Sequence, residues 1–131
     1  MPYRLLYGGR QFDVLLFARE GGSCQVEEYL ESLDDSRFIQ INALIERCAD
    51  DGPVFREGGP CRALRGFQFY EFKARRGQRV FWYRKGSAMI LLHGFTKKAE
   101  ATPRRELETA ASRFAASERE AAMKGISYDR H

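Results

Sequence analysis

The sequence has few of the residues that build disulfide scaffolds and metal centres. It contains three cysteines and two histidines among 131 residues. The cysteines (Cys24, Cys48 and Cys61) show no CxxC spacing. An odd number of widely spaced cysteines is typical of reduced thiols in a cytoplasmic protein. Because one of the two histidines is His131 at the end of the sequence, a Cys/His metal site is not expected. We therefore expect no metal ion and no cofactor.

Long apolar segments and several common catalytic motifs are also missing. The longest purely apolar run covers residues 88–92, far too few to cross a bilayer. The apolar stretch at residues 13–18 begins with an aspartate and is followed by no small-residue cleavage site, so we expect no signal peptide. We find no repeat, phosphate-binding glycine loop, HExxH zinc motif or nucleophile elbow. These absences predict a cytoplasmic protein without a membrane partner.

The basic residues are concentrated in one segment. Residues 61–105 hold 12 lysines and arginines but only two acids, a net charge of +10, whereas the other residues hold 10 bases and 16 acids, a net charge of −6. A segment with this much positive charge attracts polyanions. A basic face that is simply solvated is the simpler explanation of the same pattern. Because the segment spans several elements of one expected sheet, we favour a nucleic-acid surface.

The hydrophobic pattern predicts an α+β domain with an N-terminal strand, two helices, a three-stranded antiparallel meander and a C-terminal helix packed on one sheet. We expect a single domain over residues 1–131, with its core at about 11–115 and a C-terminal helix extension and tail at 116–131. A surface loop is expected from Gly52-Pro53 to about residue 63. The predicted strands cover residues 12–17, 67–73, 78–84 and 88–95, and the predicted helices begin near Ser23, Asp34 and Thr102.

The turns of the meander predict which side chains share a face. Residues 75–77, Arg-Arg-Gly, fit a three-residue hairpin that pairs Lys73 with Arg79. Glu71, Lys73 and Arg79 then point together, and we expect them on the open side of the sheet.

The second turn has two readings. A loop of Lys85 and Gly86 sets Arg79 opposite Leu92, whereas adding Ser87 to the loop sets Arg79 opposite His93.

Two segments resemble a known family. "FQFYEFKARRGQRVFWYRKG" and "ILLHGFTKKAEATPRRELETAASR" are similar to phage-derived Gp49-like proteins, which belong to the HigB/RelE-type toxins of bacterial toxin–antitoxin systems. The most specific parts are Glu71-Phe72-Lys73, Arg79 before an aromatic strand, and "LHGFTKK" before a Thr-Pro helix start. The resemblance covers roughly residues 61–113. The sequence departs from the family pattern at Lys73, where arginine is common, and in its longer C-terminus.

The resemblance implies a RelE-like toxin fold and a type II toxin that cleaves mRNA, usually on the ribosome. It also implies a helix-turn-helix antitoxin as partner, and it leaves a homodimer open. Two other classes of function compete with a ribonuclease: a non-catalytic RNA- or DNA-binding module on the same scaffold, and a protein whose main role is to bind a partner.

Metal-free RNA cleavage requires a base that takes the proton of the 2′-OH, cations that stabilise the charge on the phosphate, and an acid that protonates the departing 5′-oxygen. Arg79 offers a planar fork of donors to a phosphate, although it could simply pair with Glu71. Lys73 could hold the phosphate or act as the base, and Glu71 is a second candidate base. His93 is a candidate acid, but a lone histidine after an apolar run is more often structural.

The remaining basic residues are candidates for binding the RNA backbone. Lys97 and Lys98 follow the last strand, and the others lie in or beside the two hairpin turns. For each one singly, solubility is an equally good explanation. The RNA-binding candidates are Arg75, Arg76, Arg84, Lys85, Lys97 and Lys98.

Overall fold

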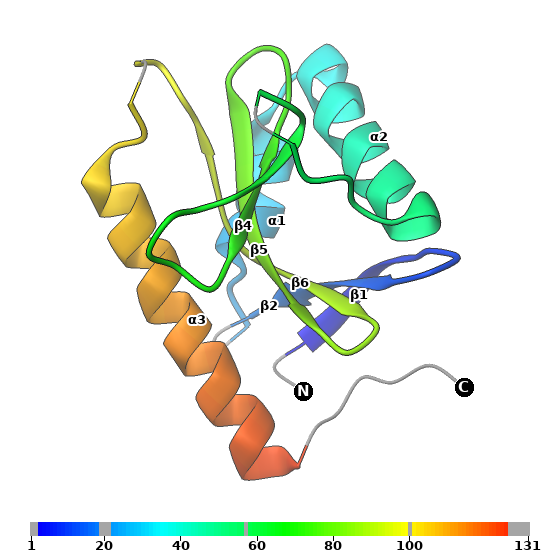
Figure 1. Cartoon of the computed structure of the whole chain (residues 1–131), viewed down its shortest axis with the longest axis vertical. Coiled ribbons are helices and arrows are strands. Elements are labelled where there is room, and N and C mark those ends of the chain that lie inside the picture. The colour runs from blue at the N-terminus through cyan, green and yellow to red at the C-terminus, as the bar shows by residue number, and fades with distance from the viewer. Residues whose placement is uncertain (1–2, 19–21, 57, 100, 126–131) are drawn as a thin grey trace.

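A computed structural model describes residues 3–18, 22–56, 58–99 and 101–125 of the chain. Within these residues the chain forms one mixed sheet and helices on both of its faces (Figure 1). No helix in this part of the chain is long and apolar enough to cross a membrane. The elements are β1 (Tyr3–Gly8), β2 (Asp13–Phe17), α1 (Gln25–Ser32), α2 (Asp35–Asp51), β3 (Cys61–Ala63), β4 (Tyr70–Lys73), β5 (Gln78–Lys85), β6 (Ala88–Thr96) and α3 (Arg104–Lys124).

The sheet has the strand order β1-β2-β6-β5-β4-β3. β2 and β6 are parallel, and every other neighbouring pair is antiparallel. β5 and β6 lie in the middle and are buried along almost their whole length. A strand covered on both faces reads as a continuous apolar run, which explains the sequences of these two strands.

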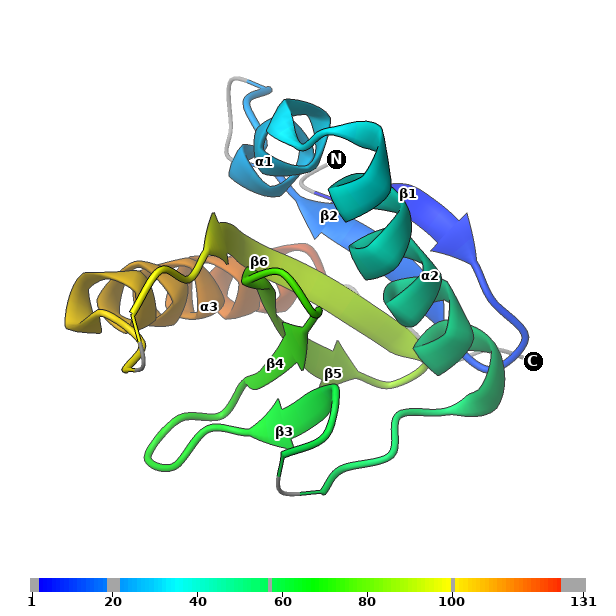
Figure 2. The same cartoon turned by 90° about the horizontal axis from the view of Figure 1, so that it is seen from above.

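Two hydrophobic cores lie on opposite faces of the sheet. Because successive side chains of a strand point to opposite faces, Val80 and Trp82 of β5 enter the core beneath α1 and α2, whereas Phe81 and Tyr83 enter the core beneath α3. Figure 2 shows α1 and α2 on one side of β6 and α3 on the other. The face that carries Arg79 is therefore partly covered by α3.

The α+β class is confirmed, but two strands were not expected. The meander forms as β4, β5 and β6 and is extended by β3 at one edge and by β2 and β1 beyond β6. β1 lacks an alternating pattern, since the neighbours Leu5 and Leu6 are both exposed on an edge strand. β3 has only three residues, too few to show a period. The segment that ends at residue 63 is thus not all loop.

The predicted ends of α2 are confirmed. Asp34 is the N-cap, and its Oδ1 accepts a hydrogen bond from the Arg37 amide at 2.9 Å. Gly52 ends the helix with φ of 90°. The predicted cap of α1 is wrong, because Cys24 rather than Ser23 is the N-cap and it makes no side-chain capping bond.

The first hairpin is confirmed and both readings of the second are wrong. Lys73 pairs with Arg79, and the Ala74 amide donates to the Gln78 carbonyl at 3.0 Å. In the second hairpin Lys85 pairs with Ala88, and a bulge then shifts the register between Phe81 and Trp82, so that Arg79 lies opposite Phe95. The extra residue of a bulge is not visible in the alternation of a strand that is buried on both faces.

Gly94 lets α1 pack closely on β6. A methyl group at this position would lie 2.9 Å from Cγ of Tyr29 and closer still to Cδ2. We expect Gly94→Ala to lower the free energy of unfolding by about 1–3 kcal/mol, the usual cost of overpacking. Urea denaturation measures this change. Gly8→Ala is the matched strand control, because its methyl group would meet nothing nearer than Asp13 Oδ1 at 3.7 Å; equal losses in the two variants would contradict the prediction.

Candidate active site

The turn between β4 and β5 and the end of β6 meet at one end of the sheet, at the top of Figure 1. The Gly77 carbonyl accepts a hydrogen bond from the Lys97 amide at 2.7 Å. Gly77 has φ of 94°, and a side chain there would collide with the Lys97 carbonyl at 2.7 Å, so both its conformation and its surroundings require glycine. This contact brings Arg75 and Arg76 of the turn to the same end as Lys97 and Lys98.

Gln78 ties this end of the sheet to α2. Its Nε2 donates to the Arg37 carbonyl at 2.9 Å and to Gln40 Oε1 at 3.0 Å, and its Oε1 accepts from the Arg76 amide at 2.8 Å. Both the oxygen and the nitrogen of the buried Gln78 amide are thus hydrogen-bonded, and these bonds fix the turn relative to α2.

A buried carboxylate lies beneath the turn. Glu71 of β4 is fully buried, and its Oε1 accepts a hydrogen bond from Arg62 Nε of β3 at 2.8 Å. Arg79 Nε of β5 lies 3.8 Å from the same oxygen. Arg79 Nη1 also donates to the carbonyls of Ala74 and Gln78, each at 3.1 Å. Within the described residues Glu71 Oε2 makes no hydrogen bond.

Two lysines complete this group of charges. Lys73 is opposite Arg79 in the ladder, and Lys97 is close enough to Arg62, Lys73, Arg79 and Glu71 for all four to affect its titration. We call these five residues the sheet-end cluster. It holds four cations and one carboxylate, so it carries a surplus of positive charge.

Two cations of the cluster have lowered pKa values. Burial lowers the pKa of Arg79 below its ordinary value, and the Glu71 carboxylate opposes that shift. Burial, followed by the charge of Arg79, lowers the pKa of Lys97, and Glu71 opposes this shift as well. Like charges and desolvation both disfavour an ammonium ion. A partly accessible lysine with a lowered pKa is a candidate for proton transfer.

The expectation that Arg79 emerges beside Lys73 on an open face is wrong. Lys73 is exposed, but Arg79 is only 7% exposed because its guanidinium turns back onto the carbonyls of its own hairpin. Glu71 has no exposed surface at all. A phosphate at this end would meet Lys73, Lys97 and Lys98, with Arg62 half-buried behind them.

His93 lies on the same face as Arg79 but belongs to a different group. The bulge pairs it with Phe81, and its partners come from α3. Its Nε2 lies 2.6 Å from Glu106 Oε2, and its Nδ1 lies 2.5 Å from Arg113 Nη1. Since arginine can only donate, Nδ1 accepts and Nε2–H donates to Glu106, which is the arrangement of a neutral imidazole. This geometry favours the structural alternative for His93.

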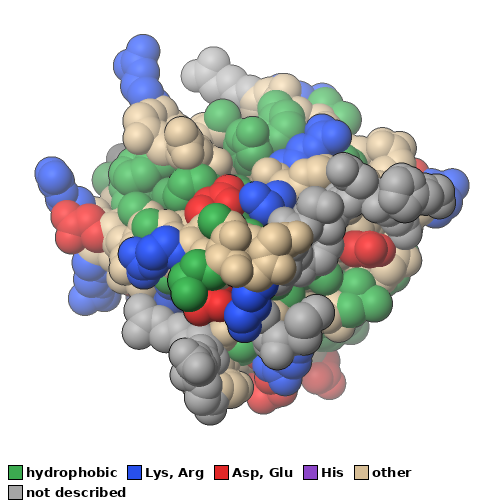
Figure 3. Space-filling view, turned by 90° about the horizontal axis from the view of Figure 1, so that it is seen from below, with side chains coloured by type: hydrophobic (Ala, Val, Ile, Leu, Met, Phe, Trp, Pro, Cys, Tyr) green, Lys and Arg blue, Asp and Glu red, His purple; other side chains and the backbone are tan. Residues whose placement is uncertain are grey.

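Arg84 and Lys85 lie at the far end of β5, so one continuous basic track through both turns does not form. Arg84 lies over the Phe12 ring at 4.8 Å, and Lys85 pairs with Glu118 at 2.8 Å. Figure 3, seen from the end of the molecule that carries this second turn, shows acidic and basic side chains interspersed among apolar ones.

Arg62 and Tyr29 are part of the site but were not identified from the sequence. Arg62 lies on the three-residue strand that the pattern did not reveal. Tyr29 lies on α1, and only the folded chain brings its hydroxyl to Thr96 Oγ1, at 2.9 Å and next to Lys97.

A family model described as "Phage derived protein Gp49-like (DUF891)" matches residues 28–115. The match covers about two thirds of the chain and includes the whole sheet-end cluster, so this protein belongs to the Gp49-like family and the resemblance is confirmed. The family is associated with toxin–antitoxin systems. None of the curated proteins matches the chain.

Glu71 can be tested as the anion that stabilises Arg79 in the interior. We expect Glu71→Gln to reduce the free energy of unfolding by about 3 kcal/mol, because it leaves a buried guanidinium without a charged partner. Urea denaturation at pH 7 measures the loss. Glu118→Gln is the matched control, since it breaks a half-exposed pair with Lys85 and should cost less than about 1 kcal/mol. A Glu71→Gln loss no larger than that of the control would contradict this role.

His93 should make stability depend on pH. Burial lowers the pKa of His93 below its ordinary 6.5; Arg113 adds to this shift and Glu106 opposes it. As the pH falls, His93 in the unfolded chain therefore binds a proton at a higher pH than His93 in the folded chain. The stability that depends on neutral His93 is fully present above pH 6.5 and is lost below it. We expect the free energy of unfolding to fall from pH 7 to pH 5.5 less steeply in His93→Gln than in the wild type. Parallel pH profiles would show that His93 does not titrate in this way.

Proposed function

We propose that this protein is the toxin of a type II toxin–antitoxin system and a metal-free endoribonuclease that cleaves mRNA on the ribosome. The observation that carries the proposal is the sheet-end cluster: four cations around one buried carboxylate, inside the region matched by the Gp49-like family. The family's association with toxin–antitoxin systems supports the biological setting. A helix-turn-helix antitoxin is the partner that this setting implies.

In this reaction the 2′-oxygen of the RNA attacks the adjacent phosphorus and the bond to the 5′-oxygen breaks, which leaves a 2′,3′-cyclic phosphate and a 5′-hydroxyl. Lys73 and Lys97 are accessible and hold the phosphate. The lowered pKa of Lys97 makes its ammonium a better acid for the departing 5′-oxygen than an ordinary lysine. Of the two candidate bases, Lys73 is the accessible one. It takes the proton of the 2′-OH when it is a neutral amine, and Lys97 then supplies the positive charge on the phosphate.

The buried members of the cluster act without touching RNA. Glu71 accepts a hydrogen bond from Arg62, and its Oε1 lies 3.8 Å from Arg79 Nε on the neighbouring strand. The Arg79 guanidinium supplies fixed positive charge behind the phosphate, in surroundings that contain little water, and the half-buried Arg62 adds to it. In this proposal Glu71 and Arg79 are positioning and electrostatic residues.

A non-catalytic RNA-binding module is the second candidate function. The burial of Arg79 and Glu71 favours it, because the accessible part of the cluster offers phosphate-binding cations but no carboxylate or histidine as a base. Such a module would bind RNA in a salt-sensitive manner and leave the message intact when ribosomes are supplied.

Lys97 gives the sharpest test between the two functions. Expression in bacteria, followed by primer extension on cellular messages, should reveal discrete 5′ ends. With purified ribosomes, cleavage of the same message should stop when the 2′-oxygen at the cleaved position is methylated. We expect Lys97→Gln to lower the single-turnover cleavage rate about 100-fold or more, the usual contribution of a proton donor.

Lys98→Gln is the matched control, because Lys98 is the exposed neighbour on the same link. It should weaken RNA binding slightly and, when the protein is in saturating excess over RNA, leave the single-turnover cleavage rate unchanged. Equal rates for Lys97→Gln and Lys98→Gln would remove Lys97 from proton transfer. Binding without any cleavage by the wild type would favour the non-catalytic module.

A further inference from the structure

An open hollow of about 360 Å³ lies between α2 and the adjoining end of β4. Its floor is apolar, formed by Leu44, Pro60 and Ala74. Three cations contribute to its wall: Arg47 of α2, Lys73 at the end of β4, and Arg75 of the turn. Gln40 completes the lining. A volume of this size lies in the range of pockets that hold small ligands.

The cations of this hollow have no internal partners. Within the described residues, Arg47, Lys73 and Arg75 are exposed and form no ion pair or side-chain hydrogen bond. Elsewhere most arginines and lysines are paired, as Arg4 is with Glu27 and Lys85 with Glu118. Exposed cations that converge without an acid leave a positive potential that an external anion can neutralise.

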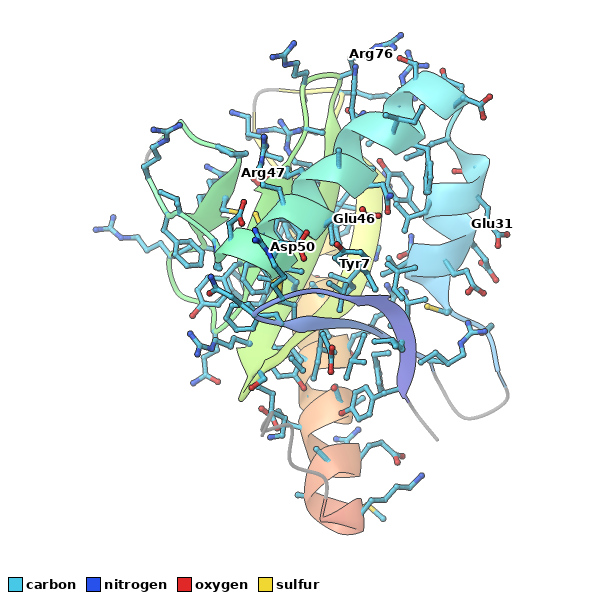
Figure 4. All side chains as sticks on the ribbon, turned by 90° about the vertical axis from the view of Figure 1, so that its right-hand side faces the viewer. Tyr7, Glu31, Glu46, Arg47, Asp50 and Arg76 are labelled. Atoms are coloured by element: carbon cyan, nitrogen blue, oxygen red, sulfur yellow. The ribbon has the colours of Figure 1, made fainter. Side chains whose placement is uncertain are left out.

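The acids of α2 are turned away from the hollow. In Figure 4, Arg47 lies on the side of α2 toward β3 and β4, whereas Glu46 and Asp50 lie toward Tyr7 and β1. Asp50 is engaged there, since it accepts hydrogen bonds from the Tyr7 hydroxyl at 2.8 Å and from the Arg10 amide at 2.9 Å. The helix therefore presents a cation to the hollow and uses a nearby carboxylate elsewhere.

We propose that this hollow binds one nucleotide of a single-stranded RNA, next to the phosphate held by the sheet-end cluster. The apolar floor accommodates a base or ribose, and Arg47 and Arg75 bind the phosphates on either side of it. Lys73 belongs to both the hollow and the cluster, so a strand that occupies one passes directly to the other. This inference deepens the proposed function and rests on it for the position of the cleaved bond.

Binding of a short 2′-O-methyl RNA tests the inference without cleavage, because the blocked 2′-oxygen cannot attack. Fluorescence anisotropy over a series of salt concentrations gives the dissociation constant and its salt dependence. We expect Arg47→Gln to weaken binding severalfold and to reduce the salt slope by about 0.7, the value for one phosphate contact of a single strand. Arg119→Gln, which removes an exposed cation on α3, should leave both quantities unchanged.

Two outcomes would overturn the nucleotide site. One is wild-type affinity and salt slope in Arg47→Gln; the other is an equal loss in Arg119→Gln, which would indicate a general charge effect. Either result is compatible with full mRNA cleavage by the same proteins, in which case the ribonuclease stands and only this subsite fails. If the wild type cleaves no RNA but Arg47→Gln alone loses binding, the subsite stands and the proposed catalysis fails.

Discussion

The candidate site depends on one buried carboxylate that lies against two arginines from neighbouring strands. Glu71 has no contact with solvent, and removing charges from water costs several kcal/mol per ion unless they are paired. The pairing is possible only when β3, β4 and β5 keep the register that sets Arg62 opposite Glu71, and Lys73 opposite Arg79. The electrostatic requirement and the hydrogen-bonded ladder therefore specify the same alignment. Since one carboxylate cannot neutralise all the cations around it, the positive surplus remains at the rim, where Lys73 and Lys97 lie.

Because helices cover both faces of the sheet, a ligand can reach the sheet only at its ends and edges. The two ends of β5 show how differently similar residues can be used. At one end, Arg84 and Lys85 are occupied by an aromatic ring and by a glutamate of α3. At the other end, Arg75 and Lys73 lie beside a hollow and have no acidic partner in the described structure. The net charge of the chain is only +4, so its total charge gives no reason to propose a nucleic-acid surface. The proposal comes from the distribution of paired and unpaired cations.

The sequence was informative wherever structure depends on a few neighbouring residues. The Arg-Arg-Gly turn at 75–77 and the Asp34 cap of α2 follow from local backbone chemistry, and both were predicted correctly. The bulge in the β5–β6 pair leaves no mark in strands that are buried on both faces, so neither proposed register was right. The burial of Arg79 was also beyond prediction. It depends on the guanidinium turning back onto the carbonyls of Ala74 and Gln78, and on the carboxylate of Glu71, contacts that exist only in the folded sheet.

In the proposed ribonuclease, one buried arginine, Arg79, and two accessible lysines, Lys73 and Lys97, have different roles. Burial lowers the pKa of Arg79 and the Glu71 carboxylate opposes that shift. A guanidinium remains protonated in proteins, so Arg79 keeps its charge. A charge held in surroundings poor in water acts on a nearby phosphate more strongly than one that is fully hydrated, and it needs no reorientation during the reaction. Contact with the phosphate is left to Lys73 and Lys97, which are accessible and can release the product. In the proposed reaction, the accessible lysines therefore hold the RNA, whereas the buried guanidinium stabilises the transition state from inside the protein.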